Sequence, residues 1–207
     1  HLQRAGFPPA LSEKAGLLVP RRGSGWYDRF RHRIVFPIED LHGNVVGFGG
    51  RALGGAKTAG DDAKYLNSPE TPVYRKAEVL YNLQRAKASA TRSGEVFLVE
   101  GYTDVIAMVR AGVTNTVATC GTALGEGHFR LASRFAQRMV LAFDSDDAGA
   151  RAAERAFEFV ERFPVQPVVL ILPEGLDPAD FVDQHGGETL RELAAGGMTM
   201  LIATHEM

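Results

Sequence analysis

Cysteine is nearly absent from this chain, with one among 207 residues. A single cysteine excludes a disulfide framework and any zinc site built from several cysteines of the chain. Long apolar runs are missing as well: the clearest covers only residues 168–172, whereas a membrane span needs roughly 20 residues. The first ten residues contain no initiator methionine and no apolar stretch typical of a signal peptide. We therefore expect a fragment of a longer intracellular protein.

Lysine is absent from residues 93–207, which carry 8 Arg against 17 Asp and Glu, a net charge of −9. Residues 1–92 carry 15 Lys and Arg against 8 Asp and Glu, a net charge of +7. The overall charge of −2 argues against a uniformly basic nucleic-acid-binding protein. A basic part followed by an acidic part instead favours a partner with phosphates and a site that holds cations.

Short apolar runs alternate with helical patterns in the second half of the chain. Strands are predicted at 96–99, 116–119, 139–143 and 168–172, and helices at 103–111, 126–136 and 147–163. This alternation indicates a small, mainly parallel α/β sheet. Elsewhere, residues 33–53 predict two strands around the turn His42-Gly43-Asn44, and helices are predicted at 76–92 and 187–197.

Three acidic residues lie at or just after the ends of predicted strands. Glu100 comes after the strand at 96–99, and Asp144 and Asp146 come after the strand at 139–143. In an open α/β sheet, functional groups gather at the carboxyl ends of the strands, so these side chains are expected at one edge. Crowded carboxylates repel one another, and a hard cation such as Mg²⁺ or Mn²⁺ relieves that repulsion.

Simpler explanations and other motifs compete with this interpretation of the acidic residues. Helix capping explains Asp147 about as well as metal binding does, and it is a weaker explanation for the whole acidic set. An EF-hand is excluded because Arg155 stands where its loop requires Glu. A P-loop at residues 50–58 is excluded because Ala56 separates the second glycine from Lys57.

Several segments resemble known protein families. Glu100-Gly101 with Asp104, the run Asp144-Ser145-Asp146, and Asp177-Pro178 after the last strand resemble the Toprim domain of primases, topoisomerases and some nucleases. Longer segments extend the resemblance to bacterial DnaG-type primases over nearly the whole chain. They are YDRFRHRIVFPI (27–38), KYLNSPETPVYRKAEVLYNL (64–83), EGYTDVIAM (100–108), CGTAL (120–124) and FDSDDAGARAA (143–153).

The resemblance implies an α/β protein in three parts. They are a basic α+β subdomain at 1–92, a Toprim metal-binding catalytic domain at 93–185 with a Rossmann-like parallel sheet covered by helices on both faces, and the truncated start of a helical subdomain at 186–207. It also implies a DNA-directed RNA polymerase, a nucleotidyltransferase that makes short RNA primers de novo on single-stranded DNA during replication. We expect the fragment alone to be weakly active.

The resemblance also implies partners and a location. The partners are single-stranded DNA template, NTPs and the RNA primer, and, through regions absent here, the replicative helicase and single-strand-binding protein. No membrane partner is expected, and the location is the cytoplasm, associated with the nucleoid at replication forks. Zinc is expected only in a cysteine-rich module absent from this chain.

Site residues follow from the same resemblance. Glu100, Asp144 and Asp146 are expected to bind two or more Mg²⁺ or Mn²⁺ ions and to act in catalysis. Asp104 and Asp177 are expected nearby. Some relatives place a second aspartate where Ala179 stands, and Asp180, one residue further, is the candidate to replace it. The expected nucleotide- and DNA-binding residues are Arg51, Lys64, Asn67 and Lys76, with Tyr65 and Tyr74 stacking on bases.

Alternatives remain open for the basic residues and for the function. The cations would otherwise belong to a solvated loop, and the alternating Arg29, Arg31 and Arg33 would mark either one strand face directed at DNA or a charged, protected strand edge. Another Toprim enzyme, such as a topoisomerase or nuclease fragment, and a non-catalytic binding module are the competing functions. For a primase, the active site is expected where the basic and acidic halves meet.

Overall fold

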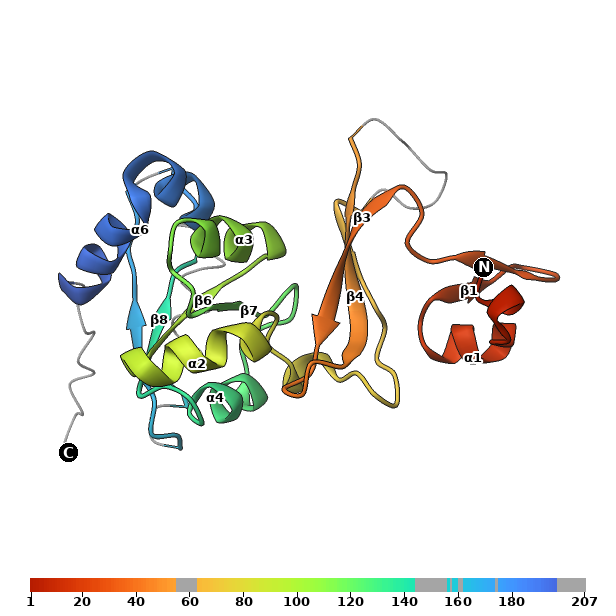
Figure 1. The fold of residues 1–207 in the computed structure, drawn as a ribbon, viewed down its shortest axis with the longest axis horizontal. Helices are drawn as coiled ribbons and strands as arrows, with labels where there is room; N and C mark the ends of the chain where they lie inside the picture. The colour runs from red at the N-terminus through yellow and green to blue at the C-terminus, as the bar shows by residue number, and fades with distance from the viewer. Residues whose placement is uncertain (55–62, 144–155, 157, 160–161, 174, 197–207) are drawn as a thin grey trace. The chain divides into compact units, whose positions relative to one another are not determined.

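A computed structural model describes residues 1–54, 63–143, 156, 158–159, 162–173 and 175–196 (Figure 1). The chain divides into two compact units, His1–Lys76 and Ala77–Met207. Helix α2 (Leu83–Ser93) packs on strands of the second unit. The division after residue 92 and the further division after residue 185 stay predictions.

The first unit contains short helices and two antiparallel sheets. Its elements are η1 (Gln3–Ala5), α1 (Pro9–Lys14), β1 (Leu18–Pro20), β2 (Trp26–Asp28), β3 (Arg33–Glu39), β4 (Val45–Ala52) and β5 (Tyr65–Asn67). Strand β1 pairs with β2, and the larger sheet has the order β3-β4-β5. The predicted turn between β3 and β4 is confirmed, since Asp40 Oδ1 accepts the N–H groups of His42 and Asn44 and Gly43 has a φ of 89°.

The three alternating arginines do not share a strand face, so that interpretation was wrong. Only Arg33 lies in β3, whereas Arg29 and Arg31 lie in the turn before it. Arg33 is buried, and its Nη1 donates to the carbonyl oxygens of Gly50 (3.3 Å) and Ala63 (2.9 Å). Because the chain turns between Arg29 and Arg33, the three side chains do not point the same way. The hydrogen bonds of Arg33 connect the start of β3 to the segment before β5.

Replacing Arg33 by Met should destabilise the protein. The substitution keeps an unbranched stem but leaves buried carbonyl oxygens without their charged donor, so we expect a loss of about 2 kcal/mol in the free energy of unfolding. Urea denaturation followed by circular dichroism measures the change. Arg22→Met is the matched control, because Arg22 is exposed in the turn between β1 and β2; equal midpoints for the two variants would contradict the assigned role.

The second unit is built around a four-stranded parallel sheet. Its elements are α2, β6 (Glu95–Val99), α3 (Tyr102–Arg110), β7 (Thr116–Ala118), α4 (Glu126–Ala132), β8 (Arg138–Leu141), β9 (Gln166–Val169) and α6 (Pro178–Gly196). The sheet order is β7-β6-β8-β9, with every pair parallel. Figure 1 shows α3 and α6 on one side of this sheet and α2 and α4 on the other. The expected parallel α/β sheet with helices on both faces is confirmed.

The short apolar runs of the second half of the chain lie in the core, as the sequence predicts. Strand β6 buries Val96, Phe97, Leu98 and Val99 completely or nearly so, as expected of a strand covered on both faces. The described helices include none that is long and apolar enough to cross a membrane.

Some boundaries differ from the sequence-based expectations. The helix predicted at 76–92 is instead a 3₁₀ turn, η2 (Lys76–Glu78), followed by α2, because Asn82 adopts a φ of 66° that a helix cannot include. The last predicted strand is displaced toward the N-terminus, to Gln166–Val169. Most of the helix predicted at 147–163 lies outside the described residues.

Candidate active site at the carboxyl edge of the parallel sheet

The order of the four strands marks one position on the sheet as a ligand site. The chain passes from β6 outward to β7 and then returns across β6 to β8. In open α/β sheets ligands bind beyond the carboxyl ends of the strands at such a reversal, which here is between β6 and β8. Glu100 directly follows β6 and is exposed. In the sequence Asp144 follows Phe143, where the described segment 63–143 that contains β8 ends.

Asp104 shapes the loop that carries Glu100. Its Oδ2 accepts the N–H of Gly101 at 3.0 Å, which caps helix α3. A side chain at position 101 would meet that carboxylate, since an added Cβ would lie 3.0 Å from the same oxygen. Glycine at 101 therefore allows a tight turn from β6 into α3, and Asp104 holds the turn closed.

The loop after β7 is attached to the same turn. Cys120 donates its N–H to the carbonyl oxygen of Glu100 at 3.1 Å, and Cys120 and Gly121 both have positive φ. The Cys120 side chain is buried, and this burial raises the pKa of its thiol, an effect that the charge of Asp104 increases. Cys120 is thus a neutral packing residue under the carboxyl edge of the sheet.

His128 is a structural residue of this edge that the sequence patterns did not indicate. It is fully buried, and its Nδ1 accepts the N–H of Gly125 at 3.2 Å at the start of α4. The available signal is its position three residues after Gly125, where a side chain can cap a helix, although glutamate or glutamine is the usual residue there.

The structure describes two of the remaining acidic candidates, Asp177 and Asp180, and does not describe Asp144 and Asp146. Asp177 Oδ1 accepts the N–H of Asp180 at 2.7 Å, so Asp177 caps α6, and Asp180 lies exposed in its first turn. Asp144 and Asp146 lie outside the described residues. Among the residues that the structure describes, no group of three or more His, Cys, Asp and Glu side chains is placed to hold a metal ion. Carboxylate oxygens, which Glu100, Asp144 and Asp146 all supply, are the donors that Mg²⁺ and Mn²⁺ prefer.

In the first unit, four of the predicted nucleotide-binding residues come together. Arg51 in β4 pairs with Tyr65 in β5, and Asn67 lies two residues further on the same face of β5. The Arg51 guanidinium and the Lys64 Nζ each lie 5.8 Å from the centre of the Tyr65 ring. Arg29, which the site prediction did not include, donates from Nε to the Asn67 carbonyl oxygen at 3.3 Å. We call Arg51, Lys64, Tyr65 and Asn67 the basic cluster.

Lys76 and Tyr74 stand outside this cluster. Lys76 lies in η2, and its backbone N–H donates to Glu70 Oε1 at 2.9 Å. Tyr74 is only 3% exposed, and its ring packs so closely on Gly47 that an added Cβ would lie 3.1 Å from it. The Tyr74 ring is therefore buried in the core, which argues against the expectation that it stacks on a base.

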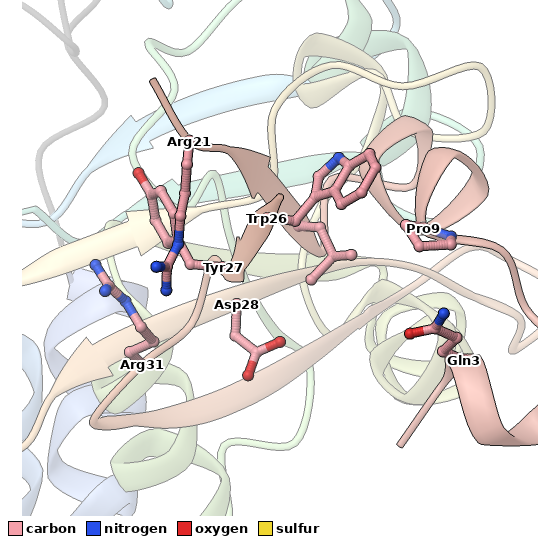
Figure 2. A pocket seen from close by; sticks show the side chains of 8 residues that line it. Gln3, Pro9, Arg21, Trp26, Tyr27, Asp28 and Arg31 are labelled. Carbon is pink, nitrogen blue, oxygen red and sulfur yellow. The ribbon is translucent and has the colours of Figure 1, made fainter. Parts of the chain in front are cut away.

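A hollow of about 490 Å³ opens beside β1 and β2 in the first unit. Figure 2 shows the side chains of Arg21, Tyr27 and Arg31 gathered in it, with Trp26 and Pro9 further along. The Arg31 guanidinium lies 4.4 Å from the centre of the Tyr27 ring. Arginines and aromatic rings are the groups that bind a nucleic-acid backbone and stack on bases. The hollow includes Arg31, but it includes neither the residues of the basic cluster nor Lys76 and Tyr74.

The sequence of this chain is similar to those of known DNA primases. Residues 1–87 match the family model of the DNA primase catalytic core, N-terminal domain, and residues 97–182 match the Toprim-like model. The chain is 46% identical to a DNA primase of Synechococcus elongatus over 94% of its own length and 28% of that protein. It thus spans about three tenths of the length of the curated relatives that it matches.

Solved structures give the same result. The RNA polymerase domain of Mycobacterium tuberculosis primase DnaG has a TM-score of 0.86 and 39% identity, over 96% of this chain and 66% of that one. A DnaG primase catalytic domain bound to single-stranded DNA has a TM-score of 0.84 and 36% identity, over 96% of this chain and 64% of that one. The chain therefore belongs to the DnaG-type primase family and contains the N-terminal and Toprim parts of its catalytic core.

Proposed function

We propose that this chain carries the nucleotidyl-transfer centre of a primase, which joins NTPs into short RNA primers on single-stranded DNA. The observation that carries the proposal is the position of Glu100, which follows β6 at the point where the strand order reverses, next to the strand that precedes Asp144 in the sequence. The match to primases over 94% of the chain supports the reaction class.

The acidic residues divide into two roles in this proposal. Glu100, Asp144 and Asp146 would hold two or more Mg²⁺ or Mn²⁺ ions, which neutralise the charge on the attacking and leaving oxygens of the displacement. Asp104 and Asp177 each accept a backbone N–H within the part of the chain that the structure describes. They would orient the loops of the acidic edge and contact the ions through water, and Asp180 would stand beside Asp177 with an exposed carboxylate.

The basic cluster would bind phosphates of the template or of the incoming nucleotide. Arg51 and Lys64 present two cations around Tyr65, and Asn67 adds an amide that can bond a base or a sugar. Lys76 would add a third cation. A solved relative of 36% identity is described as bound to single-stranded DNA, which supports this assignment.

The product of one reaction separates the candidate functions. Full-length protein supplied with NTPs, a single-stranded template and Mg²⁺ or Mn²⁺ should make new RNA. A nuclease would degrade the template, and a non-catalytic module would leave both unchanged; either result would contradict the proposal.

Replacing Lys64 by Ala should weaken binding of single-stranded DNA and reduce its salt dependence. One phosphate contact fewer lowers the slope of log K against log salt concentration by about 0.7 for single strands. Fluorescence anisotropy at several salt concentrations measures both quantities. Lys14→Ala is the control, because Lys14 is an exposed lysine of α1 outside the basic cluster. An unchanged slope in Lys64→Ala would rule out the phosphate contact.

A further inference from the structure

Strand β7 is an edge strand of the parallel sheet, but its outer edge is covered near its carboxyl end. Tyr81 donates its N–H to the carbonyl oxygen of Ala118 at 2.9 Å, and Ala118 donates back to Tyr81 at 3.2 Å. The side-chain amide of Asn82 donates to the Thr116 carbonyl oxygen at 2.9 Å. Three hydrogen bonds thus join residues 81–82 to a strand of only three residues.

The backbone of Asn82 is specialised for this arrangement. Its φ of 66° lies in the left-handed region, which asparagine tolerates better than most residues other than glycine. The turn at Asn82 lets the chain pair with β7 through Tyr81 and then enter α2 at once. We call residues 81–82 the Tyr81 strap. They are hydrogen-bonded to β7 and do not merely connect η2 to α2.

The Tyr81 strap also reaches the loop that carries Glu100. The Tyr81 and Tyr102 rings meet edge to face, with their centres 4.8 Å apart and their planes at 81°. Tyr102 is the first residue of α3, two positions after Glu100, and is only 2% exposed. Its side chain lies near the Cys120 thiol, and the Cys120 N–H donates to the Glu100 carbonyl oxygen.

These contacts form two routes from the strap to one residue. One route runs from Ala118, the last residue of β7, through the loop that follows to Cys120, whose N–H donates to the Glu100 carbonyl oxygen. The other runs through the Tyr102 ring into the turn at Glu100 and Gly101. Every link except the exposed Glu100 carboxylate itself is partly or fully buried, so neither route can shift without opening the core.

We propose that Tyr81 and Asn82 are positioning residues, which hold Glu100 in the geometry that binds the divalent ion. The inference rests on the proposed function of Glu100 as a metal ligand. Residues that orient metal ligands affect metal affinity as well as stability, whereas a residue that only supports the fold changes stability alone.

Metal binding without turnover provides the decisive measurement. Full-length Tyr81→Leu keeps an apolar side chain and loses the ring contact with Tyr102, while Tyr81→Phe keeps the ring and serves as the control. Titration with Mn²⁺, followed by the electron paramagnetic resonance signal of the free ion, should show binding about tenfold weaker for Tyr81→Leu and unchanged for Tyr81→Phe. Binding of single-stranded DNA should be unchanged in both.

Asn82→Gly keeps the left-handed backbone and removes only the amide bond to Thr116, so it tests the strap if Tyr81→Leu does not fold. It should also weaken Mn²⁺ binding and raise the Mg²⁺ concentration for half-maximal primer synthesis, with little change in the KM for NTP. Folded variants that melt at lower temperature but bind Mn²⁺ as the wild type does would overturn the inference.

The same titration separates this inference from the proposed function. Wild-type protein that binds Mn²⁺ but makes no RNA would contradict primer synthesis, while the Mn²⁺ affinities of the variants would still decide the role of the strap. Wild-type protein that makes RNA, with variants of unchanged Mn²⁺ affinity, would overturn only the inference. Wild-type protein that binds no Mn²⁺ would overturn both.

Discussion

Glu100→Gln should lower the rate of primer synthesis by about 10³-fold or more. A carboxylate that holds a divalent ion supports several kcal/mol of charge stabilisation in the transition state, and each factor of ten in rate corresponds to about 1.4 kcal/mol. The amide has nearly the same shape but no charge. Asp144→Asn and Asp146→Asn should give losses of the same order.

The fold should be unaffected by the Glu100 substitution, which makes the result interpretable. The Glu100 side chain is exposed, and the hydrogen bonds that hold its turn use the Glu100 carbonyl oxygen and the Gly101 N–H, which the substitution leaves in place. Melting temperature and single-stranded DNA binding should therefore equal those of the wild type. Incorporation of labelled NTP into RNA by the full-length protein measures the rate.

Glu192→Gln is the matched control for this experiment. Glu192 is an exposed carboxylate on α6, so the same chemical change there should leave the rate within a factor of two. If Glu100→Gln kept half or more of the wild-type rate, Glu100 would be neither a metal ligand nor a catalytic residue.

Elements with a strong local pattern could be predicted from the sequence. The run at 96–99 became a completely buried strand, and the turn at His42-Gly43-Asn44 formed because a glycine with positive φ and an aspartate that accepts two N–H groups act within a few residues. Such features depend on near neighbours, so the sequence contains the information needed to recognise them.

Features that depend on distant contacts could not be predicted in this way. The order β7-β6-β8-β9 determines which strand ends are neighbours, and no local pattern encodes it. The spacing of apolar residues also predicted one unbroken helix at 76–92. The structure breaks it at Asn82, whose left-handed conformation is stabilised by a hydrogen bond to Thr116, 34 residues away. Tyr74 looked available for stacking until its contact with Gly47 placed it in the core.

One missed helix did have a local signal. Helix α6 has two parts separated by a kink at Gly186. The second part is the helix predicted from residue 187, whereas the first part, which begins at Pro178 and is capped by Asp177, was not predicted. An aspartate followed by proline is a common start of a helix, because the capping oxygen binds free N–H groups and proline lacks one. Asp177 was instead interpreted only as an acidic site residue, although capping is the role that its contacts show.

Gly187→Ala should destabilise the protein strongly, although it adds only one methyl group to α6. An added Cβ at 187 would lie 2.2 Å from the carbonyl oxygen of Ala111 and 2.9 Å from Val113 Cγ2. The nearest atom belongs to the backbone at the end of α3, so it cannot move aside as a flexible side chain would. We expect a loss of about 3 kcal/mol in the free energy of unfolding, at the upper end for an overpacked core.

The position of α6 makes that contact hard to relax. Arg138 donates from Nη2 to the Ala194 carbonyl oxygen and forms an ion pair with Glu95 at 2.7 Å, while Arg191 donates to the Gly112 carbonyl oxygen at 3.1 Å. Both attachments lie within two turns after Gly187, so α6 can move away from the added methyl group only by breaking these bonds. At Gly187 glycine is needed because there is no room for a Cβ atom. At Gly186 it is needed because the backbone has a φ of 82°, which interrupts the helix.

Gly196→Ala on the same helix is the matched control, since an added Cβ there would have no atom within 4 Å. Alanine also favours the helical backbone more than glycine does, so this variant should be as stable as the wild type or slightly more stable. Urea denaturation of both variants measures the difference. Equal stability of Gly187→Ala and wild type would mean that α6 does not pack on the end of α3 in solution.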